Sequence, residues 1–136
     1  MVTEHNADRW RVRAVRGATT VDRDDPERMY EATRELLCAI LDRNGLSAAD
    51  IVSAIFTVTP DLNCAFPARA ARDLGWTEVP MLCATEIAVP DSPSRCVRVL
   101  LHVERPDLAP RPLHVYLRGA ATLRPDLAAN AAPLAP

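Results

Sequence analysis

The residues of this sequence that could do chemistry are arginines set among apolar or small neighbours. Arg98 lies in the middle of residues 95–103, whose β-branched and apolar composition predicts a β-strand. Side chains alternate across a strand, so the valines and leucine at odd positions form a core face and Arg98 lies on the opposite face. An unpaired charge is costly there. Arg98 therefore needs an anionic partner, either a carboxylate of the protein or a ligand.

Three further residues could help to bind and orient an anionic ligand. Arg16 ends a predicted strand over residues 10–16, where a single arginine is most often a solvated charge. Glu86 closes a predicted strand over residues 79–86, and Tyr116 lies in a short strand over residues 114–117. This inventory is typical of a site that binds and orients a small polyanion, and it suits proton transfer or covalent attack poorly.

Several familiar chemistries are excluded or disfavoured. The chain contains no lysine, which rules out Schiff-base, pyridoxal-phosphate and P-loop chemistry. It has no GxGxxG, GxSxG or HExxH motif, and its three histidines lack metal-ligand spacing, so we expect no metal and no cofactor. A nucleophilic mechanism would need Cys83 or Cys96 beside His102, and the arginine-rich inventory disfavours it.

Length and composition indicate one domain in a reducing compartment. The 136 residues carry a net charge of −2, with no basic tract for nucleic acid and no apolar run of membrane-spanning length. The four cysteines show no CxxC spacing, and we expect reduced thiols and a cytoplasmic protein. We divide the chain into a flexible N-terminal extension (1–9), one domain (10–127) and a mobile C-terminal tail (128–136).

The remaining elements must position these side chains. Residues 24–27, with two aspartates before Pro26, are typical of a helix start, and Gly45 is typical of its end; on this amphipathic helix Cys38 is expected to be buried. Residues 51–58 are apolar on both faces, which indicates a central, covered strand. A short helix over residues 67–75 carries Arg69 and Arg72 on one side, as a solvated basic face or as an anion-binding one.

Five segments in order carry a family resemblance. They are Val15 to Val21, Thr59 to Leu62 with Ala65 to Arg72, Cys83 with Glu86, Arg95 to Val99, and His114 to Leu117 with Leu123 to Leu127. Over residues 12–127 the chain resembles the monofunctional bacterial chorismate mutases of the trimeric, sheet-containing (Bacillus) type.

The resemblance implies both a fold and a reaction. The fold is α+β, a mixed β-sheet packed against helices, in a homotrimer that forms a pseudo-α/β barrel with active sites at subunit interfaces. The reaction is the Claisen rearrangement of chorismate to prephenate in phenylalanine and tyrosine biosynthesis. It proceeds without a cofactor, by electrostatic stabilisation and conformational restriction of a dicarboxylate.

The resemblance also implies residue roles. Arg98 would meet the ether oxygen, Arg16 and Tyr116 a substrate carboxylate, and Glu86 the ring hydroxyl, with Cys83 beside it. The adjacent subunit would supply a pocket wall, and a C-terminal segment would fold over the site. These further substrate-binding residues are Phe66, Ala68, Arg69, Arg72, Leu82, Leu123 and Arg124.

Two residues depart from the family pattern, and two alternatives remain. Arg69 stands where lysine is frequent, and Leu82 stands where a threonine is seen. The first alternative is a trimeric imine deaminase with a similar sheet, which would release ammonia. The second is a trimer that binds a small anion without catalysing a reaction.

Overall fold

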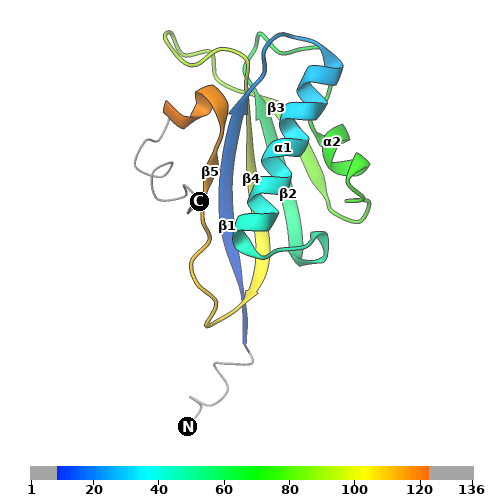
Figure 1. Cartoon of the computed structure of the whole chain (residues 1–136), viewed down its shortest axis with the longest axis vertical. Helices are drawn as coiled ribbons and strands as arrows, with labels where there is room; N and C mark the ends of the chain where they lie inside the picture. Colours follow the sequence, from blue (N-terminus) through cyan, green and yellow to red (C-terminus); the bar gives the residue numbers. More distant parts are fainter. Residues whose placement is uncertain (1–8, 123–136) are drawn as a thin grey trace.

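A five-stranded mixed sheet forms the body of the protein, in the order β3-β2-β4-β1-β5 (Figure 1). The computed structural model describes residues 9–122. The strands are β1 (Trp10–Thr20), β2 (Ile51–Val58), β3 (Met81–Thr85), β4 (Cys96–Pro106) and β5 (Val115–Tyr116), and the helices are α1 (Pro26–Asn44) and α2 (Ala68–Asp73), with 3₁₀ turns η2 (Ala48–Asp50) and η3 (Arg118–Thr122).

The central strand β4 pairs with two strands that are distant in sequence. It runs antiparallel to β1 on one side and to β2 on the other. At the edges, β5 lies parallel to β1 and β3 lies parallel to β2. The observed architecture confirms the expected α+β class with a mixed sheet.

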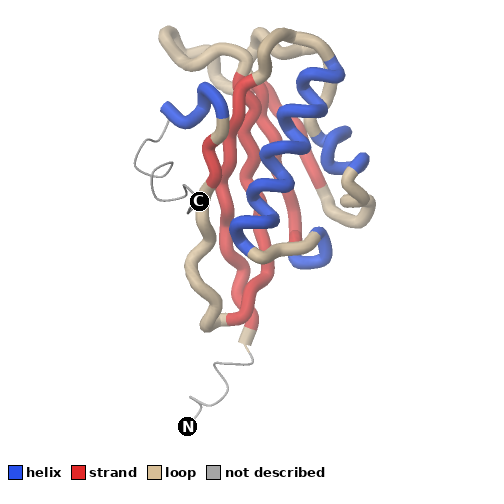
Figure 2. The backbone as a smooth tube through the Cα atoms, viewed as in Figure 1, coloured by secondary structure: helices blue, strands red, loops and turns tan. Residues whose placement is uncertain are grey.

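Both α-helices cover the same face of this sheet (Figure 2). Asp25 accepts the Arg28 N–H at the start of α1, and Gly45, at φ +60°, ends it, as the sequence predicts. Leu36 and Ile40 of α1 are fully buried against the sheet. Gly17 permits the close approach, since a Cβ at this residue would lie 2.7 Å from Ile40 Cδ1.

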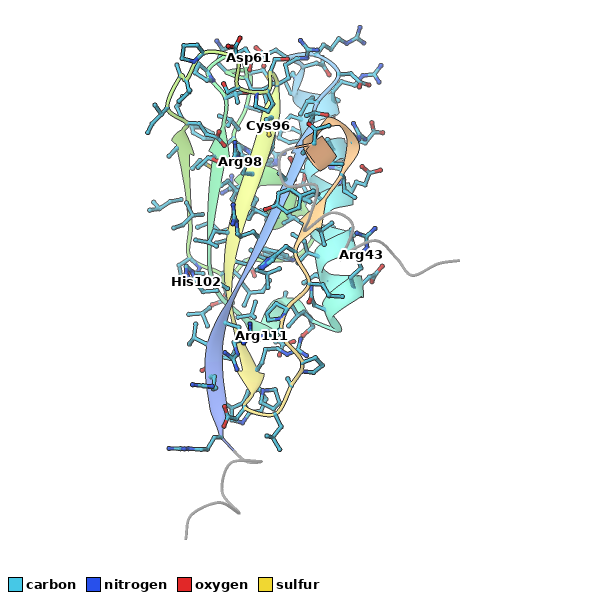
Figure 3. All side chains as sticks on the ribbon, turned by 90° about the vertical axis from the view of Figure 1, so that its left-hand side faces the viewer. Arg43, Asp61, Cys96, Arg98, His102 and Arg111 are labelled. Atoms are coloured by element: carbon cyan, nitrogen blue, oxygen red, sulfur yellow. The ribbon has the colours of Figure 1, made fainter. Side chains whose placement is uncertain are left out.

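The alternation expected for β4 is confirmed. Val97, Val99, Leu101 and Val103 are buried on the face that α1 covers. Arg98 and His102 point to the other side of the strand, away from α1 (Figure 3). We call this second face, which carries Arg16, Arg98 and Leu100, the open face. Neither α1 nor α2 covers it.

Three sequence predictions are wrong in detail. β1 does not end at Arg16 but continues to Thr20, because residues 17–20 keep pairing with β4, with Thr20 opposite Cys96. Cys38 is exposed, since it lies on the side of α1 away from the sheet. β2 is central, with partners on both sides, yet it is not covered on both faces, because Val52 and Ile55 remain exposed.

No helix within residues 9–122 is both long enough and apolar enough to cross a membrane.

Candidate active site

Three of the predicted site residues line one cavity on the open face. Arg16 of β1, Arg98 of β4 and Tyr116 of β5 surround a volume of about 250 Å³. The wall between them is largely apolar, so charge is concentrated on the two guanidinium groups. The other residues lining the cavity are Gly17, Ile55, Thr57, Val99 and Leu100.

Strand register explains why these side chains meet. Ala18 of β1 lies opposite Arg98 of β4 and is also the register partner of Tyr116 of β5. Arg16 lies opposite Leu100, two residues further along β4, and therefore shares the face of Arg98. The backbone N–H of Arg16 donates to His114 Nδ1 at 3.0 Å, which extends the contact between β1 and the segment entering β5.

Glu86 is the carboxylate that meets Arg98. It follows β3, where its backbone N–H donates to the Val58 carbonyl at 2.9 Å. Its Oε2 lies 3.0 Å from Arg98 Nε and accepts the Thr57 hydroxyl at 2.6 Å. The Glu86 side chain is 16% exposed and that of Arg98 is 38% exposed, so this ion pair borders solvent. Arg98 thus forms an ion pair with a carboxylate of the protein and also lines an open cavity.

The sequence reasoning missed residues that complete this cavity. Ile55 and Thr57 line it from β2, Leu100 from β4 and Gly17 from β1. Alternation along residues 51–58 places Ile55 and Thr57 on one face, and this signal could have indicated both residues.

Two other predicted residues, Phe66 and Cys83, lie in a second cavity. It has a volume of about 270 Å³. Burial raises the pKa of the Cys83 thiol above its ordinary value, while the Ala68 backbone N–H and the charge of Arg72 act in the opposite direction. The thiol is therefore protonated near neutral pH, which does not suit a nucleophile.

The remaining predicted residues do not reach the Arg98 cavity of the same chain. Arg69 lies 3.3 Å (Nε to Oδ1) from Asp73 and above the ring of Tyr30, with Cζ 5.8 Å from its centroid. Arg72 of α2 and Leu82 of β3 are exposed, and Ala68 is buried. Leu123 and Arg124 lie outside the described residues.

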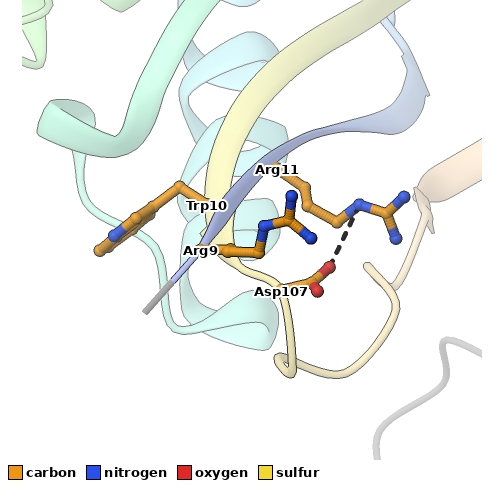
Figure 4. A pocket seen from close by; sticks show the side chains of 4 residues that line it. All are labelled: Arg9, Trp10, Arg11 and Asp107. Atoms are coloured by element: carbon orange, nitrogen blue, oxygen red, sulfur yellow. Dashed lines mark ion pairs between the residues drawn. The ribbon is translucent and has the colours of Figure 1, made fainter. Parts of the chain in front are cut away.

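A larger cavity of about 400 Å³ lies at the N-terminal end of β1 (Figure 4). Arg9, Trp10, Arg11 and Asp107 line it, and Arg11 Nε is 3.2 Å from Asp107 Oδ1. Asp107 offsets part of the arginine charge here, as Glu86 does beside Arg98, and none of the site residues predicted from the sequence lines this cavity. Within residues 9–122, no group of three or more His, Cys, Asp or Glu side chains could hold a metal ion.

Comparisons with known proteins identify several relatives of this chain. The family model "Chorismate mutase type I" matches residues 12–127. The chorismate mutase AroH of Thermus thermophilus is 50% identical over 117 residues, covering 85% of this chain and 96% of the relative. That of Bacillus subtilis (strain 168) is 40% identical over 117 residues, covering 85% and 92%. A solved chorismate mutase from Clostridium thermocellum superimposes with a TM-score of 0.72 at 45% identity, covering 80% and 97%.

The fold and the cavity define a protein with an arginine-lined cavity, of a chemistry suited to a small anion, on one face of a mixed sheet. Its two arginines supply paired donors for carboxylates, and Glu86 adds an acceptor. Since the family model matches most of the chain and both relatives exceed 30% identity, the chain belongs to the type I chorismate mutase family.

Proposed function

We propose that this family member catalyses the rearrangement of chorismate to prephenate in the cavity that holds Arg16, Arg98 and Tyr116. The observation that carries the proposal is the meeting of two arginines from different strands in one largely apolar cavity. Chorismate is a dicarboxylate, and guanidinium groups bind carboxylates through paired donors.

The rearrangement requires electrostatic stabilisation of its transition state and orientation of the substrate. It is unimolecular, so no cofactor and no covalent intermediate is needed. As the C–O bond breaks, negative charge develops on the ether oxygen, and a fixed cation binds this state more strongly than the ground state. Holding the enolpyruvyl arm in the reactive chair removes an orientation cost. Arg98, held on the central strand, is the cation we assign to the ether oxygen.

The other side chains take roles that fit their positions. Arg16 binds a substrate carboxylate, and Tyr116, from the neighbouring strand, supports the same group. Glu86 accepts the ring hydroxyl. Its Oε2 is occupied by Thr57 and Arg98, so Oε1 is the oxygen we assign to the substrate.

A second set of residues completes the site from an adjacent subunit of a trimer. This set is Phe66, Ala68, Arg69 and Arg72: Phe66 lines a separate cavity, and the other three lie on α2. Exposed apolar residues on and near the sheet support burial against other copies of the chain. They are Val12, Ile55, Phe66, Leu82 and Ile87.

The protein acts in the cytoplasm under this proposal. All four cysteines are free thiols, which is typical of a reducing compartment.

Purified protein mixed with chorismate tests the function directly. We expect ultraviolet absorbance of chorismate to fall, with prephenate as the product. Ammonia release from an imine substrate would instead favour a deaminase, and calorimetric binding of chorismate without turnover would indicate an anion-binding trimer. Sedimentation equilibrium tests the assembly: a fully active monomer would contradict the shared site.

A further inference from the structure

The hydroxyl of Thr57 contacts Glu86 next to Arg98, and the roles assigned above give it no part in the reaction. It donates to Glu86 Oε2 at 2.6 Å, and the same oxygen lies 3.0 Å from Arg98 Nε. Thr57 and Arg98 are register partners on adjacent antiparallel strands, so their side chains stand side by side on the open face. Glu86 Oε2 thus accepts one hydrogen bond, from Thr57 of β2, and forms an ion pair with Arg98 of β4.

The Glu86–Arg98 contact is close but incomplete. Arg98 Nε is buried and makes no aligned hydrogen bond to any of the described residues, although its distance to the carboxylate is that of an ion pair. A guanidinium and a carboxylate frequently pair through two parallel N–H···O bonds. Here the Thr57 hydroxyl directs Oε2 toward β2, and the same oxygen faces Arg98 through Nε.

We propose that Thr57 is a positioning residue that keeps Glu86 from fully neutralising Arg98. With Oε2 held by the Thr57 hydroxyl, the outer N–H groups of Arg98 and the second oxygen of Glu86 remain available to a ligand. This inference rests on the proposed function, in which Arg98 stabilises the ether oxygen and Glu86 accepts the ring hydroxyl.

Three substitutions separate this role from a merely structural one. Thr57→Val keeps the side-chain shape and removes the hydroxyl, and Thr57→Ser restores it. Thr33→Val is the matched control, because the Thr33 hydroxyl is buried in α1 and has no hydrogen-bond partner among the described residues. We expect Thr57→Val to lower kcat about tenfold or more, the effect of losing one hydrogen bond to a charged group. Thr57→Ser should recover most of the rate, and Thr33→Val should leave it unchanged.

A double-mutant cycle with Glu86→Ala gives the deciding measurement. If Thr57 acts through the carboxylate, Thr57→Val costs little further activity once that carboxylate is absent. Fully additive losses, or a Thr57→Val protein with wild-type kcat, would overturn the inference.

Crystal structures of the wild-type and Thr57→Val proteins supply a readout that does not depend on activity. We expect the variant to show Arg98 and Glu86 in a two-bond pair, and an unchanged contact would overturn the inference. Wild-type protein that fails to convert chorismate would refute the proposed function instead, and the crystallographic comparison would still test the position of Glu86.

Discussion

Replacement of Arg98 by lysine tests the central electrostatic claim. Arg98→Lys retains a positive charge, but an ammonium is a compact donor that cannot contact Glu86 and a ligand oxygen through one planar fork. Because Arg98 Nε already faces Glu86 Oε2 at 3.0 Å, the outer guanidinium nitrogens are the ones that can extend to substrate. Lysine has no equivalent of them.

The expected loss lies in turnover rather than in binding or stability. Removing a donor that acts on developing charge costs about 3 kcal/mol, which lowers kcat about 10²-fold or more. The ion pair with Glu86 borders solvent, so its loss should change the free energy of unfolding by about 1 kcal/mol or less.

Steady-state kinetics on chorismate and denaturant unfolding measure these two effects separately. Arg11→Lys is a suitable control, since Arg11 is also paired with a carboxylate but lies at the cavity at the N-terminal end of β1. If Arg98→Lys turned over nearly as fast as the wild type, Arg98 would not stabilise the transition state.

Other measurements follow from the same structure. We expect kcat to be flat across neutral pH, because no proton is transferred and burial keeps the Cys83 thiol protonated; a bell-shaped profile would refute this. Burial opposes ionisation of Asp61, yet the Thr59 hydroxyl and neighbouring backbone donors lower its pKa below 3.8. Its contribution to stability is therefore present above about pH 4 and lost as pH falls further. We expect Asp61→Asn to lower the free energy of unfolding by about 1 kcal/mol and to weaken this acid dependence, in urea titrations at several pH values. Gly17→Ala places a Cβ 2.7 Å from Ile40 Cδ1 and should cost about 1–3 kcal/mol of stability, seen as a lower Tm.

Local sequence signals were sufficient to predict most of the helices and strands that surround the site. Residues 24–27 predicted the start of α1 and Gly45 its end. In the structure the Asp25 side chain caps the first turn, and Gly45 ends the helix through its left-handed conformation. The C-terminal end of β1 could not be predicted from local signals. Residues after Arg16 are small enough for a turn, but they are in a strand because they pair with β4 as far as Cys96, a contact between segments distant in sequence.

The candidate site was predicted in part. Arg16, Arg98 and Tyr116 were singled out from the sequence and share one cavity, whereas Phe66 and Cys83 lie in another. Whether the two sets meet depends on contacts between subunits, which no pattern within one chain can fix.

The sequence by itself determined the face of β4 on which Arg98 lies, since alternation along a strand follows from backbone geometry alone. It also determined that every fixed positive side chain is an arginine, since the chain has no lysine. Only the tertiary structure decided which carboxylate and which hydroxyl Arg98 meets. Glu86 and Thr57 reach it through a register between strands far apart in the chain, and that register is set by packing of the whole core rather than by any local pattern.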